Sequence, residues 1–216
     1  MLIKKCVCGG TDFEGHHENG LNLLTCQDCG VMHQEVLLNE DEYDGFYSTE
    51  YHGDYQEKIG LKPYKERYNH DRRIASIRLG EYNKYLNINS VSLDIGCSNG
   101  AFVDEMRNRG FKRSYGIDIA LESNPEYSYT GHLKNTNFQT EHFDFITMHD
   151  VLEHIVDLNS FMTELNRVVR FGGTAVVDFP DYFDKSGKHH WRPIQHLWFF
   201  NKEQLAEYFA KFGFYV

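Results

Sequence analysis

The stretch between Val91 and Asp118 constrains the fold more strongly than any other part of the chain. An apolar run, 91–95, leads directly into a turn with a glycine at each end, Gly96–Gly100, and a helix-like segment follows over about 100–109. A second apolar run then ends at Asp118. Glycines let the backbone approach a ligand closely, and a carboxylate about twenty residues after such a turn accepts hydrogen bonds from ribose hydroxyls. The pattern predicts an α/β fold with a nucleoside-binding turn.

The spacing of the glycines indicates which nucleoside cofactor binds. Dinucleotide-binding turns read Gly-x-Gly-x-x-Gly, whereas this turn reads Gly96-x-x-x-Gly100 with Asp94 two residues before it. A Walker A loop is excluded here, because no Gly-Lys-Ser or Gly-Lys-Thr follows the turn. The segment resembles motif I of the class I S-adenosylmethionine (SAM) dependent methyltransferases, Asp/Glu-x-Gly-x-Gly-x-Gly, with Ser98 in place of the middle glycine. The resemblance implies a Rossmann-like methyltransferase sheet.

Two later segments extend this resemblance. Residues 143–154 are similar to the fourth strand and the following turn of the family, and Gly172-Gly173 leading into 174–178 is similar to its turn between a helix and strand five. Because the order and spacing of all these segments match, the resemblance covers roughly residues 70–216.

The resemblance also implies the cofactor contacts. In this family the acid before the first glycine contacts the methionine end of SAM, and the acid after the second strand holds the ribose. These positions are Asp94 and Asp118 here, and 135–138 occupies the region where relatives contact adenine. The residues expected to contact SAM are Asp94, Gly96, Cys97, Ser98, Asn99, Gly100, Asp118, Ile119, His149 and Asp150.

Composition limits the class of partner. The chain has 216 residues and a formal net charge of −10 at pH 7, and an acidic surface repels the nucleic-acid backbone, so nucleic acid is not expected as a substrate. No apolar run approaches the roughly 20 residues that a membrane span needs, so no membrane partner is expected. No secretory leader pattern follows Met1, so we expect a cytoplasmic protein.

Four of the five cysteines lie within the first 30 residues and predict a structural zinc site. Cys26-x-x-Cys29 followed by glycine is typical of a zinc knuckle, and the 17 residues between Cys8 and Cys26 fit a zinc ribbon. The first pair is irregular, because one residue instead of two separates its cysteines. The expected zinc ligands are Cys6, Cys8, Cys26 and Cys29. His16 or His17 could replace one of these thiolates as a ligand. The alternative to a zinc site is four reduced thiols that bind no metal.

A ribbon joined to a methyltransferase domain resembles a bacterial group that acts in sugar and capsular or other surface-polysaccharide biosynthesis. The segment Tyr47–Tyr51 is similar to the Tyr-Ser-x-Glu-Tyr stretch that those proteins carry after the ribbon. We therefore expect a zinc-ribbon-like module over 1–40, a linker and helical segment over 41–69, and a SAM-binding domain over 70–216. Because relatives continue into two further strands, we expect the C-terminal strands of the sheet to be truncated at Val216.

Hydrophobic periodicity and capping residues predict the remaining elements. Expected strands are 91–95, 114–118, 129–133, 143–148 and 174–179, and expected helices are 63–87, 100–109, 157–170 and a helix capped by Asn201 with Gln204. In the first helix, the apolar stripe expected to face the core is Ile74, Ile77, Tyr82 and Tyr85.

Methyl transfer is an in-line displacement, so the protein must position the acceptor and take a proton from a hydroxyl nucleophile. Asp150, Glu153 and His154 share one face if their turn is helical, and quinone-pathway O-methyltransferases carry a similar Glu-x-x-Glu-His group that holds a divalent metal. The alternative, which we favour, is that Glu153 and His154 cap the turn and line the cofactor pocket. His154 and His149 remain candidate bases.

Residues 188–200 form a second cluster of chemically useful side chains. Arg192 can pair with phosphate, aromatic rings can stack on a sugar or base, and the resemblance places His196 in a recurrent His-x-x-x-Phe segment near the active site, as a candidate general base. His189 and His190 are equally consistent with a solvated loop, and at least two of the three aromatic residues at 198–200 are expected in the core.

These observations predict a SAM-dependent methyltransferase that O-methylates a sugar hydroxyl, with a nucleotide-sugar or glycoside as its small-molecule substrate. One rival is C-methylation of a keto-sugar, which needs a base at the carbon next to the ketone. The other rival is a domain that binds SAM or a partner without turnover. The acceptor, the methylated position and the oligomeric state are not determined by the sequence.

Overall fold

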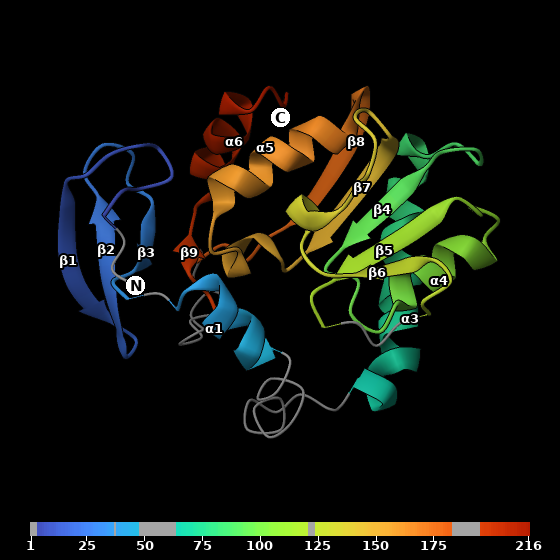
Figure 1. Cartoon of the computed structure of the whole chain (residues 1–216), viewed down its shortest axis with the longest axis horizontal. Helices are drawn as coiled ribbons and strands as arrows, with labels where there is room; N and C mark the ends of the chain where they lie inside the picture. Colours follow the sequence, from blue (N-terminus) through green and yellow to red (C-terminus); the bar gives the residue numbers. More distant parts are fainter. Residues whose placement is uncertain (1–3, 37, 48–63, 121–123, 183–194) are drawn as a thin grey trace. The chain divides into compact units, whose positions relative to one another are not determined.

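The computed structural model describes residues 4–36, 38–47, 64–120, 124–182 and 195–216 (Figure 1). The chain divides into two compact units. One, called here the cysteine unit, comprises Met1–Asp41, Asp150–Asn166 and Asp178–Val216, and the other, the parallel-sheet unit, comprises Glu42–His149 and Arg167–Val177. Each unit is described by itself below.

The parallel-sheet unit is built on five strands in the order β6-β5-β4-β7-β8. Strand β4 pairs in parallel with β5 on one side and β7 on the other, and β5 pairs in parallel with β6. The carboxyl ends of these four strands therefore meet at one edge, which is where open α/β sheets bind ligands. The strands are β4 (Ser92–Ile95), β5 (Ser114–Asp118), β6 (Ser128–Thr130), β7 (Phe143–His149) and β8 (Val169–Asp178).

The helices of this unit include α3 (Tyr64–Tyr82) and α4 (Ala101–Asn108), with short 3-10 turns η2 (Asn83–Tyr85) and η3 (Leu133–Asn135). Of the apolar stripe expected to face the core, only Tyr82 packs against it, because Ile74, Ile77 and Tyr85 are 36%, 64% and 47% exposed. The buried face instead carries Ala75 and Leu79, which join a core cluster with Phe102, Met106, Phe111 and Phe145. The small side chain of Ala75 suits close packing, which apolar spacing alone does not reveal.

The cysteine unit contains a second, antiparallel sheet in the order β1-β2-β3-β9. Its strands are β1 (Phe13–Glu18), β2 (Leu21–Cys26), β3 (Met32–Gln34) and β9 (Trp198–Phe199), so a strand from the C-terminal part completes the N-terminal sheet. Its core is made by Leu21, Leu23, Met32, Tyr182 and Phe199. The same unit contains η4 (Leu152–His154) and α6 (Lys202–Lys211). The residues of α1 (Glu40–Gly45) and α5 (Leu158–Val168) are divided between the two units.

Strands β4 and β5 and helices α4 and α6 are confirmed within a residue or two, and α6 begins with the expected capping box of Asn201 and Gln204. Helix α5 is also within two residues of its expected bounds. The expected turn at 172–173 is wrong, because β8 runs through it. Gly172 has φ 76° and a side chain on Gly173 would lie 2.9 Å from the carbonyl oxygen of Arg170, so the glycines mark an irregularity within the strand. Strand β6 begins one residue earlier than expected and is shorter.

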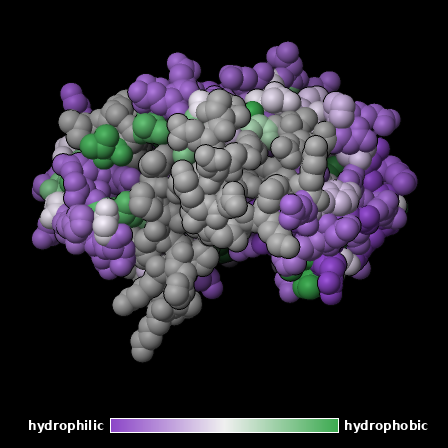
Figure 2. Space-filling view, turned by 90° about the horizontal axis from the view of Figure 1, so that it is seen from below, coloured by the Kyte–Doolittle hydropathy of each residue, from purple (hydrophilic) through white to green (hydrophobic). Residues whose placement is uncertain are grey.

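The face shown in Figure 2 is largely hydrophilic where it is coloured, with hydrophobic residues in separate patches. Across the described ranges, no helix has both the length and the apolar character that crossing a bilayer requires. Of the expected Tyr47–Tyr51 motif, only Tyr47 belongs to the described residues.

Candidate functional site

The glycine turn after β4 has the backbone conformation that the sequence predicts. Gly96 and Gly100 have φ of 75° and 76°, and the amides of Gly96 and Cys97 both donate to the carbonyl of Ile117, at 2.8 and 3.1 Å. Ser98 also lies in the left-handed region, with φ 52°. That conformation costs about 1–2 kcal/mol for a residue with a Cβ, and such strain tends to collect at functional sites.

Asp118, at the end of β5, holds this turn from the side. Its Oδ2 accepts a hydrogen bond from the amide of Ser98 at 2.8 Å, and its Oδ1 accepts one from the amide of Ala120 at 2.9 Å. Each carboxylate oxygen has two lone pairs and can accept a second hydrogen bond. The carboxylate is therefore fixed in position beside the turn.

Asp94 and His149 form a second polar group in the parallel-sheet unit. Asp94 is 5% exposed and accepts a hydrogen bond from Thr147 Oγ1 at 2.7 Å, and its Oδ1 lies 3.6 Å from Nδ1 of His149. The imidazole of His149 stacks on the ring of Tyr82, at 6.0 Å between centroids and 11° between planes, and its Nε2 lies 3.2 Å from the Tyr82 hydroxyl. Phe102 packs edge-on against the same imidazole.

Helix α3 supplies two residues to this region, Asp71 and Tyr82, that the sequence did not assign to the site. The side-chain amide of Asn99 donates to Asp71 at 2.8 Å, so α3 braces the glycine turn, as Tyr82 braces His149. Both residues lie in the helix expected over 63–87, but nothing in their spacing indicates which side chains reach the turn.

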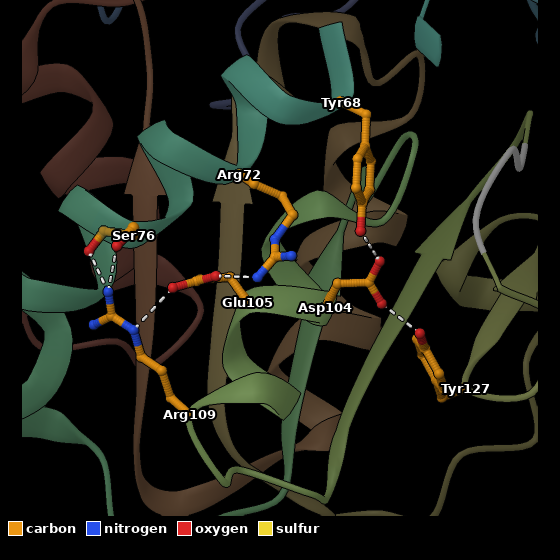
Figure 3. Close-up of polar contacts among 7 residues, drawn as sticks. All are labelled: Tyr68, Arg72, Ser76, Asp104, Glu105, Arg109 and Tyr127. Carbon is orange, nitrogen blue, oxygen red and sulfur yellow. Dashed lines mark hydrogen bonds and ion pairs between the residues drawn. The ribbon is translucent and has the colours of Figure 1, made fainter.

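Figure 3 shows how α3 is also fastened to α4, the helix that follows the turn. Asp104 accepts hydrogen bonds from the phenols of Tyr68 and Tyr127. Burial, and then the hydrogen bond to Asp104, raise the pKa of Tyr68 to about 12. Beside them Glu105 accepts from Arg72 at 2.5 Å and from Arg109 at 3.1 Å, and the hydrogen bond from Arg72 lowers the pKa of Glu105.

These features fit SAM on physical grounds. A turn with three left-handed residues brings backbone close to a ligand, a fixed carboxylate stands beside it for the ribose, and a buried carboxylate lies on the neighbouring strand for the methionine end. In β5 a side chain on Gly116 would lie 2.6 Å from Sγ of Cys97, so glycine at that position lets the turn pack against the strand. Ile119 is half-buried after β5, and Asp150 has φ 53° after β7.

In the cysteine unit the four N-terminal cysteines come together. Their Sγ atoms all lie within 4.8 Å of one another, with Cys6–Cys29 and Cys8–Cys26 at 3.6 Å. A tetrahedral ion with Zn–S bonds of about 2.3 Å separates its sulfurs by about 3.8 Å, so the spacing suits zinc. Neither His16 nor His17 belongs to this group.

The turns around the cysteines explain why the irregular first pair still fits. The amide of Gly10 donates to Sγ of Cys8 at 3.3 Å, and the amide of Cys6 donates to the carbonyl of Gly10 at 2.8 Å. A side chain on Gly10 would lie 2.9 Å from Sγ of Cys26, so only glycine leaves the cradle open. Burial raises the pKa of Cys29 to about 11, which means that an ion must displace protons to bind.

A second group of donors in the cysteine unit joins η4 to the segment before β9. Glu153, His154 and His196 offer ligand atoms within 4.8 Å of one another, and Glu153 and His196 are 0% and 4% exposed. The structure thus groups Glu153 and His154 with His196, whereas the sequence grouped them with Asp150. The two imidazoles meet edge to face at 4.9 Å between centroids.

Two residues that sequence reasoning missed hold His196. The phenol of Tyr182 lies 2.6 Å from Nδ1 of His196, and the side-chain amide of Gln34, in β3, donates to the His196 carbonyl at 2.6 Å. The Gln34 contact joins residues 162 positions apart, so no local pattern could have indicated it. Trp198, Phe199 and Phe200 are buried, as expected for at least two of them, and His189, His190 and Arg192 lie outside the described residues.

Comparison with known proteins identifies the fold. A family model described as a methyltransferase domain matches residues 68–216. No curated protein matches the chain. Similar solved structures include a SAM-dependent methyltransferase from Archaeoglobus fulgidus (18% identity, 74% of this chain and 73% of that chain covered, TM-score 0.57) and one from Thermotoga maritima (19%, 81% and 80%, 0.53).

A third similar structure is phosphoethanolamine N-methyltransferase 2 from Haemonchus contortus, in complex with phosphomonomethylethanolamine and S-adenosylhomocysteine. It is 15% identical, with 93% of this chain and 55% of that chain covered and a TM-score of 0.56. At these identities the similarity establishes a shared fold.

Proposed function

The chain belongs to the methyltransferase-domain family and has the fold of SAM-dependent methyltransferases, and on this premise we propose that it O-methylates a sugar hydroxyl. The acceptor is a nucleotide-linked sugar or a glycoside of surface-polysaccharide biosynthesis. The enzyme class rests on the family match, whereas the sugar rests on the resemblance of the ribbon and methyltransferase arrangement to that bacterial group.

One observation supports cofactor binding most directly. Asp118 accepts hydrogen bonds from the amides of Ser98 and Ala120, which places its carboxylate beside a turn made of left-handed residues. In the proposed complex Asp118 holds the ribose hydroxyls, the turn 96–100 lies along the methionyl portion, and Asp94 binds at the methionine end directly or through water.

The proposed reaction needs little covalent chemistry from the protein. The acceptor oxygen forms a bond to the methyl carbon as the carbon–sulfur bond of SAM breaks, and the hydroxyl proton passes to a base. His196 and His154 are the proposed bases. Nδ1 of His154 donates to the carbonyl of Gln195, so its Nε2 holds the lone pair that can take a proton, and Nδ1 of His196 lies against the phenol of Tyr182. His149 is a third candidate, although both of its nitrogens lie near polar groups.

We also propose that Cys6, Cys8, Cys26 and Cys29 hold a structural zinc ion. The support is the convergence of the four sulfurs, which all lie within 4.8 Å of one another, and the absence of a side chain at Gly10. A small module with a short antiparallel sheet gains folding stability from such an ion.

The test is methyl transfer from isotopically labelled SAM to a panel of acceptors, with products identified by mass spectrometry and the methylated atom by NMR. The panel contains nucleotide-linked sugars, simple glycosides and phosphoethanolamine, the last because a phosphoethanolamine N-methyltransferase has a similar fold. We expect methylation of a sugar oxygen and loss of turnover in His196→Ala with S-adenosylhomocysteine binding retained. A methylated carbon would establish the keto-sugar rival, and methylation of phosphoethanolamine alone would refute the sugar class.

Binding of S-adenosylhomocysteine, measured by calorimetry, separates the remaining rival. If the chain binds this product but methylates no compound in a small-molecule extract of cells that produce the protein, it is a non-catalytic binding domain. If it binds neither SAM nor the product, the cofactor assignment itself is wrong.

A further inference from the structure

The cysteine unit brings together a second set of donors that is chemically unlike the thiolates. Glu153 and His154 stand on the short turn η4, and His196 comes from the segment before β9, more than 40 residues later. One ligand atom of each lies within 4.8 Å of the other two. Glu153 is fully buried, and the side chain of His154 is 20% exposed, which leaves this group reachable from solvent.

Both imidazoles of the group have Nδ1 in a hydrogen bond, and for His154 this bond fixes the tautomer. Nδ1 of His154 lies 2.9 Å from the carbonyl oxygen of Gln195, and since a carbonyl only accepts, Nδ1 carries the proton and the lone pair is on Nε2. That Nε2 lies 3.9 Å from Oε1 of Glu153. Nδ1 of His196 lies 2.6 Å from the phenol of Tyr182, so Nε2 is again the nitrogen opposite the supporting bond.

This arrangement is the one that metal-binding histidines usually have. Their second nitrogen donates to a backbone carbonyl or another acceptor, which fixes the ring orientation and the tautomer. Here the supports are a carbonyl for His154 and a phenol oxygen for His196. One nitrogen of each ring also lies within 4.8 Å of a carboxylate oxygen of Glu153, which packing alone does not require.

The backbone around the donors is held as firmly as the rings. The amide of Leu197 donates to the Glu153 carbonyl at 2.7 Å, and the indole of Trp198 donates to the Ile155 carbonyl at 2.8 Å. Gln34 adds its bond to the His196 carbonyl at 2.6 Å. The turn η4 and the strand β9 are thereby tied together, so that the three donors are positioned before any ligand arrives.

From this geometry we infer that Glu153, His154 and His196 form a second metal site, which takes a divalent first-row transition cation through one carboxylate and two imidazoles. Two neutral imidazoles favour ions such as Zn²⁺, Fe²⁺, Co²⁺ or Ni²⁺ over Mg²⁺ and Ca²⁺, which prefer oxygen ligands. Three protein ligands leave coordination positions open for water or for an oxygen of a small molecule.

The metal site can exist whether or not the chain is a sugar methyltransferase. A role for the ion in methyl transfer, however, rests on the proposed function. A cation at Nε2 of His154 and His196 takes the nitrogens that would otherwise accept the acceptor proton. The cation would instead lower the pKa of a bound acceptor hydroxyl, so that the hydroxyl loses its proton without an imidazole base.

The test uses the full chain without a polyhistidine tag, stripped of metal and titrated with Co²⁺. Cobalt bound by thiolates shows intense charge-transfer absorption, whereas cobalt bound by imidazole and carboxylate shows d–d bands without it. We expect wild type to bind two equivalents, one of each spectral kind, as counted by equilibrium dialysis and elemental analysis. His196→Gln and Glu153→Gln should each lose the equivalent that lacks thiolate absorption and keep the other.

Two further variants sharpen the result. Tyr182→Phe keeps the ring and the site but removes the supporting phenol, so the affinity for Co²⁺ should fall about 10-fold. His70→Gln removes an exposed histidine of α3 and should change nothing. The inference is overturned if wild type binds cobalt only through thiolates, or if the second equivalent survives in His196→Gln and Glu153→Gln. Calorimetry with S-adenosylhomocysteine on the same samples reports the cofactor site separately, so failure of the metal site and failure of the methyltransferase assignment are distinguishable.

Discussion

The cofactor turn of the parallel-sheet unit and the polar group of the cysteine unit are assembled in different ways. The turn is held by contacts between residues close in sequence, such as Ser98 with Asp118, 20 positions apart. The group around His196 depends on contacts such as that of Gln34, 162 positions away. The first kind of site is visible in a local pattern, while the second exists only when distant segments are folded together. Each prediction below tests this contrast, in order of decreasing effect.

The largest effect is expected from Asp118→Ala. The variant loses the acceptor for the ribose hydroxyls and the acceptor that holds the amides of Ser98 and Ala120. Two charge-assisted hydrogen bonds at about 1.5–3 kcal/mol each correspond to a loss of roughly 100-fold or more in affinity for S-adenosylhomocysteine. Calorimetry measures it, with Glu126→Ala, an exposed acid in the following connection, as the matched control. Equal affinities in the two variants would contradict the ribose-binding role.

The cofactor turn and its flanking elements show how much of the structure could be predicted from the sequence. The apolar runs, the spacing of the glycines and the acid after β5 are all local, and they predict β4, α4 and β5 within a residue. The left-handed backbone of Ser98 was not foreseen, because serine carries no local signal for that conformation. The buried face of α3 was misjudged, since Ile74 and Ile77 satisfy the helical spacing yet the close contact with α4 selects Ala75 and Leu79.

The second region shows where local reasoning ends. The cysteine spacing indicates the four thiols, but not that Gly10 must stay open for them to converge. His196 could be named from its surroundings in the sequence. Its neighbour Gln34 could not, because that contact accompanies the pairing of β3 with β9, and no local pattern indicated the contact with Tyr182. The grouping of Glu153 with His196 instead of Asp150 has the same origin.

The second prediction removes the thiolate site with Cys26→Ser. Metal content should fall by about one equivalent per chain, and loss of several kcal/mol of metal-linked stability should lower the melting temperature by about 10 °C. Affinity for S-adenosylhomocysteine at a temperature below that transition should be retained, because Asp118 and the glycine turn belong to the other unit. Cys97→Ser, at the fifth cysteine, should keep the full metal content. Elemental analysis and calorimetry give both readouts, and unchanged metal content in Cys26→Ser would rule out the proposed ligand set.

The third prediction concerns Gln34→Ala, which breaks a contact between residues 162 positions apart in the cysteine unit. Loss of the hydrogen bond to the His196 carbonyl should loosen the position of the imidazole and lower kcat/KM for the acceptor by about 10-fold, the equivalent of about 1.4 kcal/mol. Affinity for S-adenosylhomocysteine should not change. Gln34→Glu tests the donor specifically, because it keeps the shape but cannot donate at neutral pH. The exposed Gln27→Ala is the control, and an acceptor kcat/KM equal to wild type in Gln34→Ala would mean that β3 does not position His196.

The smallest effect is expected in the brace between α3 and α4, where Tyr68→Phe removes the phenol that donates to Asp104. The phenol is partly exposed, so its loss should cost less than about 1 kcal/mol of unfolding free energy near pH 7. Its pKa is raised from 10.0 to about 12, so the folded state holds the proton more tightly than the unfolded state. The contribution is therefore complete below pH 10 and is lost as pH rises through about 12. Denaturant unfolding of wild type and Tyr68→Phe should accordingly give curves that converge over this range. The exposed Tyr129→Phe should follow wild type throughout, and a difference for Tyr68→Phe that grows with pH would show that the hydrogen bond to Asp104 is not what holds the proton.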